Sequence, residues 1–205
     1  MKIPQLKRKL EVKKHHSFEL KDEFSWVHQK DILSVLKDSS KLNPEVRKYL
    51  EDENAYTKLQ MQDTEKFQKK LFQEIKGRIK LDDESLHFFY RKDGWEYWTK
   101  TTKENNYSIQ LRKKIGDDKD KTEEYWNGDK EKKKLGVSYF GVGDLSVSHN
   151  HSLLGYSLDL NGSEYYTIHI RRIADKKIVA EKIENTSGGI TFSKDSKYIF
   201  YTLLN

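Results

Sequence analysis

The sequence predicts a mainly β protein with an N-terminal helical segment, in which the strands form part of a β-propeller. Three observations support this fold class. The hydrophobic period changes from helical to alternating near residue 85, short alternating segments then continue to the end, and a ten-residue segment recurs 45 residues after its first copy. A period of 40–50 residues that holds four short strands is typical of a propeller blade. A β-sandwich with strands of similar length would produce similar alternation and stays open as an alternative.

The composition excludes several classes of function. The chain has 205 residues, with 39 Lys and Arg, 33 Asp and Glu, a net charge of +6 and a mean hydropathy of −0.95. The absence of cysteine excludes disulfides, thiol catalysis and cysteine-ligated metal sites. No apolar stretch follows the basic start, and no segment is long enough to cross a membrane. We therefore expect a cytoplasmic protein without a membrane partner.

Residues 1–42 lack a clean hydrophobic period. Within them, DEFSWVHQKD (22–31) is compatible with a short helical turn that presents Phe24 and Trp26 for packing. We expect little other regular structure in this stretch.

Two helices are expected next. Asn43 is suited to cap a helix whose first residue is Pro44, because proline fits the first helical position. Apolar residues then recur at helical spacing in two runs, the second of which begins at Thr64. We predict two helices over about 44–79.

From residue 85 onwards the apolar residues alternate, as they do in strands. We expect a strand at 86–90, a hairpin turn at Asp93-Gly94, a second strand through WEYWTKTT and a third at 107–111. The charged stretch 116–134 is expected to be a flexible loop with room for one short strand. Turn residues then divide the remaining chain into strands at 144–148, 153–159, 165–172, 178–183, 189–192 and 198–203.

An internal repeat organises these strands. SHNHSLLGYS (148–157) aligns with SKDSKYIFYT (193–202), and NYSIQLRKK (106–114) resembles YYTIHIRRI (165–173). In each copy of the first pair, Asn or Asp follows Ser in a position that favours a tight reversal before the next strand. The repeat therefore favours successive propeller blades.

Several long segments resemble a known family. They are KLNPEVRKYLEDENAYTKLQM (41–61), the stretch from LFQEIKG to WEYWTK (71–100) and GSEYYTIHIRRIADKKIVAEKIENTSGG (162–189). In order, they are similar to the N-terminal part of the oligopeptidase B (protease II) group of the prolyl oligopeptidase family of serine peptidases. Segment 22–31 resembles the family's acidic-aromatic segment, although Val27-His28 stand where Leu-Arg is common.

The resemblance implies a seven-bladed propeller that covers an α/β-hydrolase domain and admits short peptides, which are cut after Arg or Lys. Residues 1–82 would be a helical segment on the hydrolase side, and residues 83–205 a truncated propeller. Its blades would be 83–135, 136–184 and the opening of a third at 185–205. About two and a half of the seven blades would be present.

The family's catalytic Ser, Asp and His would lie beyond residue 205. We therefore expect this chain to be the N-terminal part of a longer design and to be inactive alone. A separately encoded C-terminal peptidase portion would be its partner, and a decaying gene product is the other possibility. Short basic peptides would be substrates of the intact enzyme.

Nothing in the sequence supplies a peptidase nucleophile. The G-x-S-x-G elbow that such a serine requires is absent. The nearest stretch, 185–189 (NTSGG), lacks the first glycine and is expected to turn the chain. No histidine follows Ser187, so the Ser…Asp…His order fails as well.

The histidines and acidic pairs are expected to be structural. His149 and His151 form an H-x-H pair, a spacing at which both side chains could bind one metal ion. Because they occupy the turn of the repeat, they are interpreted as turn residues. We place His169 on the polar face of a strand, His15-His16 in a mobile basic end and His87 in a structural role. The acidic pairs are expected to stay solvated; they are Asp82-Asp83-Glu84, Asp117-Asp118 and Glu123-Glu124.

No phosphate-binding loop is predicted, because Gly141-Val142-Gly143 is not followed by a helix start. We therefore assign no catalytic, cofactor-binding or metal-binding residue.

Two alternative functions stay open. A non-enzymatic interaction module would pair through the open edges of the partial propeller. A nucleic-acid binder would use the positive charge and would stack bases on the aromatic residues of the first hairpin. Because lysines are interleaved with acids, and alternation makes Trp95, Tyr97, Trp98 and Tyr107 packing residues, we expect no nucleic-acid partner.

Overall fold

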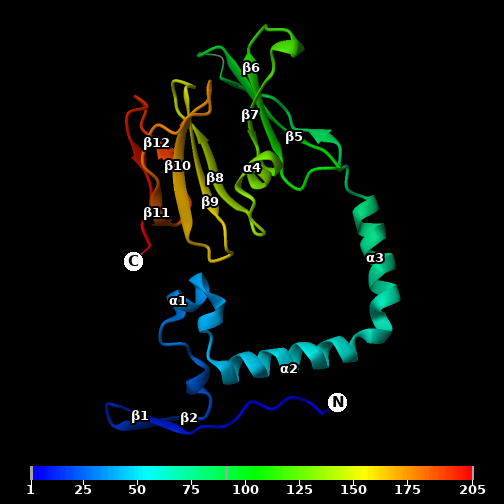
Figure 1. Cartoon of the computed structure of the whole chain (residues 1–205), viewed down its shortest axis with the longest axis vertical. Coiled ribbons are helices and arrows are strands. Elements are labelled where there is room, and N and C mark those ends of the chain that lie inside the picture. The colour runs from blue at the N-terminus through cyan, green and yellow to red at the C-terminus, as the bar shows by residue number, and fades with distance from the viewer. Residues whose placement is uncertain (1, 91, 205) are drawn as a thin grey trace. The chain divides into compact units, whose positions relative to one another are not determined.

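The computed structural model describes residues 2–90 and 92–204, and the chain divides into two compact units, Met1–Ile79 and Lys80–Asn205 (Figure 1). Among the described residues, no helix is both long and apolar enough to cross a membrane. The expected assignment of residues 1–82 to a hydrolase-side segment stays a prediction.

The first unit opens with a hairpin that the sequence did not predict. Strand β1 (Glu11–His15) pairs antiparallel with β2 (Phe18–Asp22), and His16 takes a left-handed φ of 55° in the turn. All ten strand residues are exposed. Of these ten residues only Val12, Phe18 and Leu20 are apolar, which is too few to mark the two strands in the sequence. His15 and His16 belong to this hairpin, and the expectation that they are mobile stays a prediction.

Short helical elements follow the hairpin. The predicted turn is present as η1 (Ser25–Val27), whereas α1 (Ile32–Lys37) and η2 (Ser39–Lys41) were not predicted. The side chain of Asp31 accepts a hydrogen bond from the Ser34 amide and thereby caps α1. A helix of six residues is too short to show a hydrophobic period.

The two predicted helices are confirmed. Helix α2 (Pro44–Gln60) begins at the predicted proline, and the Asn43 side chain accepts from the amides of Glu45 and Val46. A short turn, η3 (Gln62–Thr64), separates it from α3 (Glu65–Gly77). The apolar stripe of α3 is exposed along its length, at Phe67, Leu71, Phe72 and Ile75.

The second unit contains two sheets and a short hairpin. In the first sheet, β5 (Trp95–Thr101) pairs with β6 (Ile109–Lys114), and β6 pairs with β7 (Glu123–Asn127). On its other side β5 pairs with both β3 (Asp83–Glu84) and β4 (Phe88–Tyr90). The predicted hairpin turn is present, with Gly94 at a φ of 69°.

The short strand expected within 116–134 is present, but the expectation that the rest of this stretch is a flexible loop is wrong. A 3-10 turn, η4 (Lys119–Lys121), precedes β7, and α4 (Gly128–Leu135) follows it. The Asn127 side chain caps α4 at Lys130, and Gly136 ends it with a left-handed φ of 67°. Acidic residues lie in the first turn and lysines in the last, which suits the helix dipole. The dense charge of this stretch concealed these signals.

The second sheet is a four-stranded antiparallel meander. Its spatial order is β11-β10-β9-β8. The strands are β8 (Gly141–Val147), β9 (Leu153–Asp159), β10 (Tyr166–Arg172) and β11 (Ile183–Thr186). The predicted strand at 178–183 is wrong, because Ile178 makes only an isolated bridge to Arg171. The alternation there lies on exposed chain after a turn in which Lys176 takes a φ of 58°.

A two-stranded hairpin, β12 (Thr191–Phe192) with β13 (Ile199–Phe200), follows the second sheet. Figure 1 shows the hairpin, the second sheet and the first sheet succeeding one another across the unit. One core cluster joins the two sheets through residues such as Tyr97, Trp126 and Tyr156. A second cluster joins the second sheet to the hairpin through Ile168 and Phe192. The described residues thus form successive antiparallel sheets that pack on one another without closing into a ring, as the predicted partial propeller requires.

Candidate functional site

The repeat predicted from the sequence is present as two matching turns. Ser148 Oγ donates to Asn150 Oδ1 at 2.7 Å and accepts from the Leu153 amide at 2.9 Å. In the second copy, Ser193 Oγ donates to Asp195 Oδ1 at 2.6 Å and accepts from the Tyr198 amide at 3.0 Å. We call these the first turns of their sheets, because each links the first two strands.

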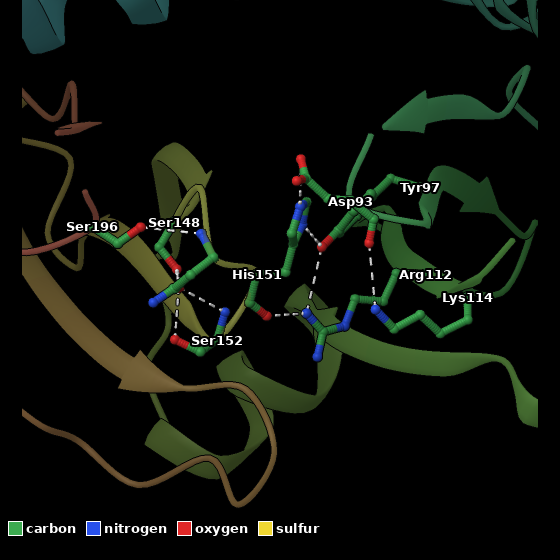
Figure 2. Close-up of polar contacts among 9 residues, drawn as sticks. Asp93, Tyr97, Arg112, Lys114, Ser148, His151, Ser152 and Ser196 are labelled. Atoms are coloured by element: carbon green, nitrogen blue, oxygen red, sulfur yellow. Dashed lines mark hydrogen bonds and ion pairs between the residues drawn. The ribbon is translucent and has the colours of Figure 1, made fainter. Parts of the chain in front are cut away.

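Each first turn places one residue in the left-handed region. This residue is His151 in the second sheet and Ser196 in the hairpin, both with a φ of 61°. The two turns are also linked, since the Asn150 amide donates to Ser196 Oγ at 3.0 Å. The first turns therefore form a connected row, and Figure 2 shows the first sheet's Asp93 facing His151 at the next step of that row.

His151 is buried between the first and second sheets, with 7% of its surface exposed. Tyr97 Oη lies 2.8 Å from His151 Nδ1, and Arg112 Nη1 lies 3.4 Å from Tyr97 Oη (Figure 2). A guanidinium is always a donor, so Tyr97 Oη accepts from Arg112 and donates its own proton to Nδ1. The tautomer of neutral His151 that fits this network carries its proton on Nε2.

His151 Nε2 has no hydrogen-bond partner among the described residues. Asp93 Oδ2 lies 3.5 Å away, an ion-pair separation without hydrogen-bond alignment. Burial lowers the pKa of His151, Asp93 opposes this change, and the positive charges of Arg112 and Lys114 add to it. Burial therefore favours the neutral imidazole, and its Nε2 makes only the longer ion-pair contact with Asp93.

A cavity of about 330 Å³ opens beside this network. Its lining combines aromatic and aliphatic side chains with the polar groups of Asp93 and of residues 146–151. The lining comprises Phe88, Tyr90, Asp93, Tyr97, Tyr125, Leu145, Ser146, Val147, Ser148, His149 and His151. We call this cavity the inter-sheet cleft.

Arg171 locks the two sheets together on β10. Its guanidinium contacts Glu131 Oε1 at 2.5 Å and donates to the Tyr125 carbonyl at 2.9 Å. It also lies over the rings of Trp126 and Tyr156, at 5.1 and 5.2 Å from their centroids. Because Tyr125 belongs to β7 and Glu131 to α4, this one side chain fixes the second sheet to a strand of the first sheet and to the helix that follows that strand.

Two side chains of the second sheet form hydrogen bonds with backbone groups of the chain that leads into the hairpin. Ser157 Oγ donates to the Gly188 carbonyl at 2.6 Å, and Asp144 Oδ2 accepts from the Ile190 amide at 2.8 Å. Gly143 permits this approach, because a Cβ there would lie 2.6 Å from Ser157 Oγ and 2.7 Å from the Tyr166 ring. These contacts hold the start of the hairpin against β8 and β9.

The structure separates His149 from His151. His149 is exposed in the turn, as expected, whereas His151 is buried in the network above. Their interpretation as turn residues is correct for the backbone of both and incomplete for the His151 side chain. Within the ranges 2–90 and 92–204, no group of three His, Asp or Glu side chains is placed to hold a metal ion.

The other histidines pack on aromatic rings. His169 alternates with buried Ile168 and Ile170 in β10 and so shares the other, polar face of the strand with Thr167 and Arg171, as expected. It is half-buried there because its ring stacks on Tyr156 at 5.1 Å. Burial lowers the pKa of His169. His87 is stacked on Trp98 at 4.3 Å and hydrogen-bonded to buried Glu96 at 3.1 Å, which fits its expected structural role.

One acidic pair departs from the expected solvation. Glu123 forms an ion pair of 2.7 Å with buried Arg112, and Glu124 accepts from Lys130 at 2.7 Å. Both glutamates are half-buried in β7. The charged run around them concealed this role, because their partners come from β6 and α4.

The remaining residues considered as candidate site residues lie in a turn, a strand or the core. Ser187 is exposed beside Gly188, whose φ of 93° bends the chain as expected. Gly141-Val142-Gly143 lies within β8 and makes no phosphate loop. Tyr97 and Trp98 are buried, and Tyr107 packs edge-on against Phe140. The packing interpretation of the aromatic hairpin is thus confirmed for these residues.

Comparison with known proteins identifies relatives along nearly the whole chain. The sequence model of the family described as "Prolyl oligopeptidase, N-terminal beta-propeller domain" matches residues 4–205. Dipeptidyl aminopeptidase BI of Pseudoxanthomonas mexicana is 30% identical over 202 residues, which cover 93% of this chain and 26% of that protein. Protease 2 of Moraxella lacunata is 24% identical over 210 residues, which cover 100% of this chain and 28% of that protein. The chain spans about a quarter of the length of these relatives.

Solved structures share the fold. Oligopeptidase B from Leishmania major matches with a TM-score of 0.81 and 21% identity, covering 100% of this chain and 29% of that one. Oligopeptidase B from Trypanosoma brucei, in a closed form with covalently bound antipain, matches with a TM-score of 0.79 and 21% identity, covering 98% of this chain and 29% of that one.

Proposed function

Because the chain belongs to the prolyl oligopeptidase family and matches its N-terminal β-propeller domain, we propose that it is the propeller part of a peptidase whose hydrolytic chemistry is carried by a catalytic portion outside these 205 residues. The match over residues 4–205 is the observation that carries this proposal. The absence of a G-x-S-x-G elbow supports it, since the family mechanism needs an exposed serine beside oxyanion donors.

The proposed substrates are short peptides cleaved after Arg or Lys, and the propeller would restrict access to the catalytic portion. The resemblance to the oligopeptidase B group supports this specificity. The inter-sheet contacts support a restricting role, because Arg171 and Arg112 each hydrogen-bond one sheet to the backbone of the adjacent sheet. No single residue of this chain carries the restriction.

Reconstitution with a catalytic portion tests the proposal. The chain is co-expressed with the part of dipeptidyl aminopeptidase BI that follows its matched region, and the purified pair is assayed with an Arg-ending chromogenic peptide. That relative's own N-terminal quarter serves as the positive control for splitting. We expect turnover by the pair and none by the chain alone.

The substitution Ser187→Ala is the matched control within this chain. Ser187 is the nearest approach to a nucleophile motif, so the proposal expects the variant to leave the turnover of the pair unchanged. Turnover by the chain alone, or a soluble co-purified pair without turnover, contradicts the proposal.

A second candidate function is an interaction module that pairs through an open sheet edge. The observation that favours it is the apolar chain at β13, where Tyr198 and Phe200 are both exposed. An exposed apolar edge is a template for pairing with another chain.

A further inference from the structure

We propose that strand β2 is an interaction surface for a second copy of this chain, and that two β2 strands pair antiparallel about Leu20 to form one sheet in the order β1-β2-β2-β1. Three features of the β1–β2 hairpin support this pairing: its exposure, the direction of its backbone groups and the signs of its charges. The pairing needs no catalytic portion and is therefore independent of the proposed function.

The hairpin lacks a third strand. All ten of its strand residues are exposed, and among the described residues β2 pairs with β1 alone (Figure 1). The exposed fraction is 72% for Phe18 and 57% for Leu20, and both side chains lie on the same face because they are two residues apart. A two-stranded hairpin is only marginally stable in water, whereas further strands and a shared apolar face stabilise it. A strand added at an edge would therefore stabilise this hairpin.

The open edge of β2 is formed by the backbone of Glu19 and Lys21. A two-residue turn connects the strands, so the pair next to it, His15 with Phe18, is a hydrogen-bonded pair. Because such pairs alternate along an antiparallel ladder, Phe18 and Leu20 direct their N–H and C=O groups at β1, whereas Glu19 and Lys21 direct theirs away from it. In a pairing about Leu20, Glu19 of each copy and Lys21 of the other copy exchange both of their N–H···O bonds.

The charges favour this pairing of β2 over the equivalent pairing of β1. About Leu20, Glu19 of each copy lies opposite Lys21 of the other copy, and the two Leu20 side chains lie opposite each other. Opposite charges across a ladder are favourable, and like charges are unfavourable. Pairing of β1 about its central residue would instead place Lys13 opposite Lys13 of the other copy. The sequence of β2 is thus complementary to itself, and that of β1 is not.

Self-complementary charges also explain why the partner is this same strand. Charged residues at a sheet edge oppose pairing with unrelated strands, which do not match their signs. A two-fold contact uses the same surface on both copies, so the assembly closes at a dimer. On one face of the dimer sheet, Phe18 and Leu20 of both copies would form a continuous apolar strip that neither hairpin has alone.

Sedimentation equilibrium of the full chain tests this inference. The exposed β13 edge is a second route to association, so the reference protein carries Phe200→Lys. We expect the reference protein to show a monomer–dimer equilibrium. Adding Lys21→Glu places like charges opposite each other in both pairs and should raise the dimer Kd at least about tenfold. Lys69→Glu, on the exposed surface of α3, makes the same change in net charge and should leave the Kd unchanged.

Mixing two variants tests the register of the pairing. Glu19→Lys should weaken the dimer as Lys21→Glu does, because it also places like charges opposite each other. An equimolar mixture of the two variants restores a Glu–Lys pair at both positions. We therefore expect the mixture to associate at least about tenfold more tightly than either variant alone. Circular dichroism verifies that both variants are folded.

Hydrogen exchange locates the contact. The amides of Glu19 and Lys21 face away from β1, so they should exchange rapidly in the monomer and become protected as the dimer forms. Their protection, followed by ¹⁵N NMR, should increase with the concentration of the reference protein. It should not increase over the same range for Lys21→Glu.

A reference protein that is monomeric at every concentration, or that forms assemblies larger than a dimer, overturns the inference. So does an unchanged Kd for Lys21→Glu, or a mixture that associates no more tightly than its components. Protection of the Glu19 and Lys21 amides only in the presence of a catalytic portion would assign the β2 edge to that portion instead. Since these measurements use the chain alone, they can fail while the reconstitution assay succeeds, and the reverse.

Discussion

Arg171 carries more of the inter-sheet contact than its position in a basic strand suggests. Only 3% of its surface is exposed, and Glu131 beside it has a side chain that is 16% exposed. The substitution Arg171→Met would leave that carboxylate buried without its cation. We expect the free energy of unfolding of the second unit to fall by about 3–5 kcal/mol.

Arg172→Met is the matched control, because Arg172 pairs with Asp175 on the surface. The expected loss there is below about 1 kcal/mol. Urea denaturation followed by tryptophan fluorescence measures both, since three of the four tryptophans, Trp95, Trp98 and Trp126, lie in the second unit. Equal losses for the two variants would show that Arg171 does not act as a buried lock.

The buried histidines predict how stability depends on pH. Burial lowers the pKa of both His151 and His169, so the unfolded chain binds more protons than the folded chain as pH falls below the ordinary histidine pKa of about 6.5. The free energy of unfolding should therefore be constant above that value and should decrease between pH 6.5 and 5.

Urea denaturation at pH 7.5 and 5.5 measures this decrease. The double variant His151→Asn, His169→Gln should show a flatter dependence, and asparagine tolerates the left-handed backbone at position 151. Stability that rises on acidification of the wild type contradicts the account.

The sequence predicted the backbone role of His151 but not the contacts of its side chain. The repeat placed it in a turn, and that placement is correct. Tyr97 lies 54 residues earlier in the chain, and nothing in local spacing predicts that the two side chains meet. Likewise the link from Arg171 to Glu131 spans 40 residues.

The first turns are the elements on which the repeat depends. Ser148→Ala would remove the acceptor of the Leu153 amide in a buried turn, and we expect a loss of about 1–3 kcal/mol in the free energy of unfolding. Ser193→Ala makes the same change in a more exposed turn, where water replaces the hydroxyl, and should cost about 0.5–1 kcal/mol. Urea denaturation of both variants distinguishes them. A larger loss at Ser193 would contradict the view that burial sets the cost.

The β13 edge predicts self-association. Phe200→Lys places a charge on an exposed apolar edge, and charged residues at sheet edges oppose pairing with other chains. We expect this variant to be more monomeric than the wild type in analytical ultracentrifugation. Thr202→Lys adds the same charge at a nearby exposed position and should have a smaller effect. If both variants associate as the wild type does, the edge is not the pairing surface.

The elements that the sequence predicted are those with strong periodicity or clear capping. Helix α2 begins at its predicted proline, and β9 spans the predicted 153–159. Helix α4 and the β1–β2 hairpin were missed, because charged side chains cover them and neither carries a distinct apolar face. Their stability comes from caps, turns and backbone pairing rather than from a hydrophobic pattern.

For the whole molecule, the repeat and the resemblance together predicted the partial propeller. The two sheets lie in the predicted order, and the β12–β13 hairpin after them has a first turn that matches that of the second sheet. The contacts between successive sheets were beyond sequence reasoning, since Asp144 and Ile190 meet across 46 residues. The structure thus adds how neighbouring sheets are fastened and what lies between them.

The central claim is that this chain is the propeller part of a peptidase and supplies no nucleophile to it. Labelling of the purified chain with a fluorophosphonate probe tests this most directly, because the probe forms a stable covalent bond only with an activated serine. Intact mass measurement should show the unmodified mass for the chain alone and a single adduct on the catalytic portion of the reconstituted pair. A stoichiometric adduct on any serine of this chain would contradict the claim.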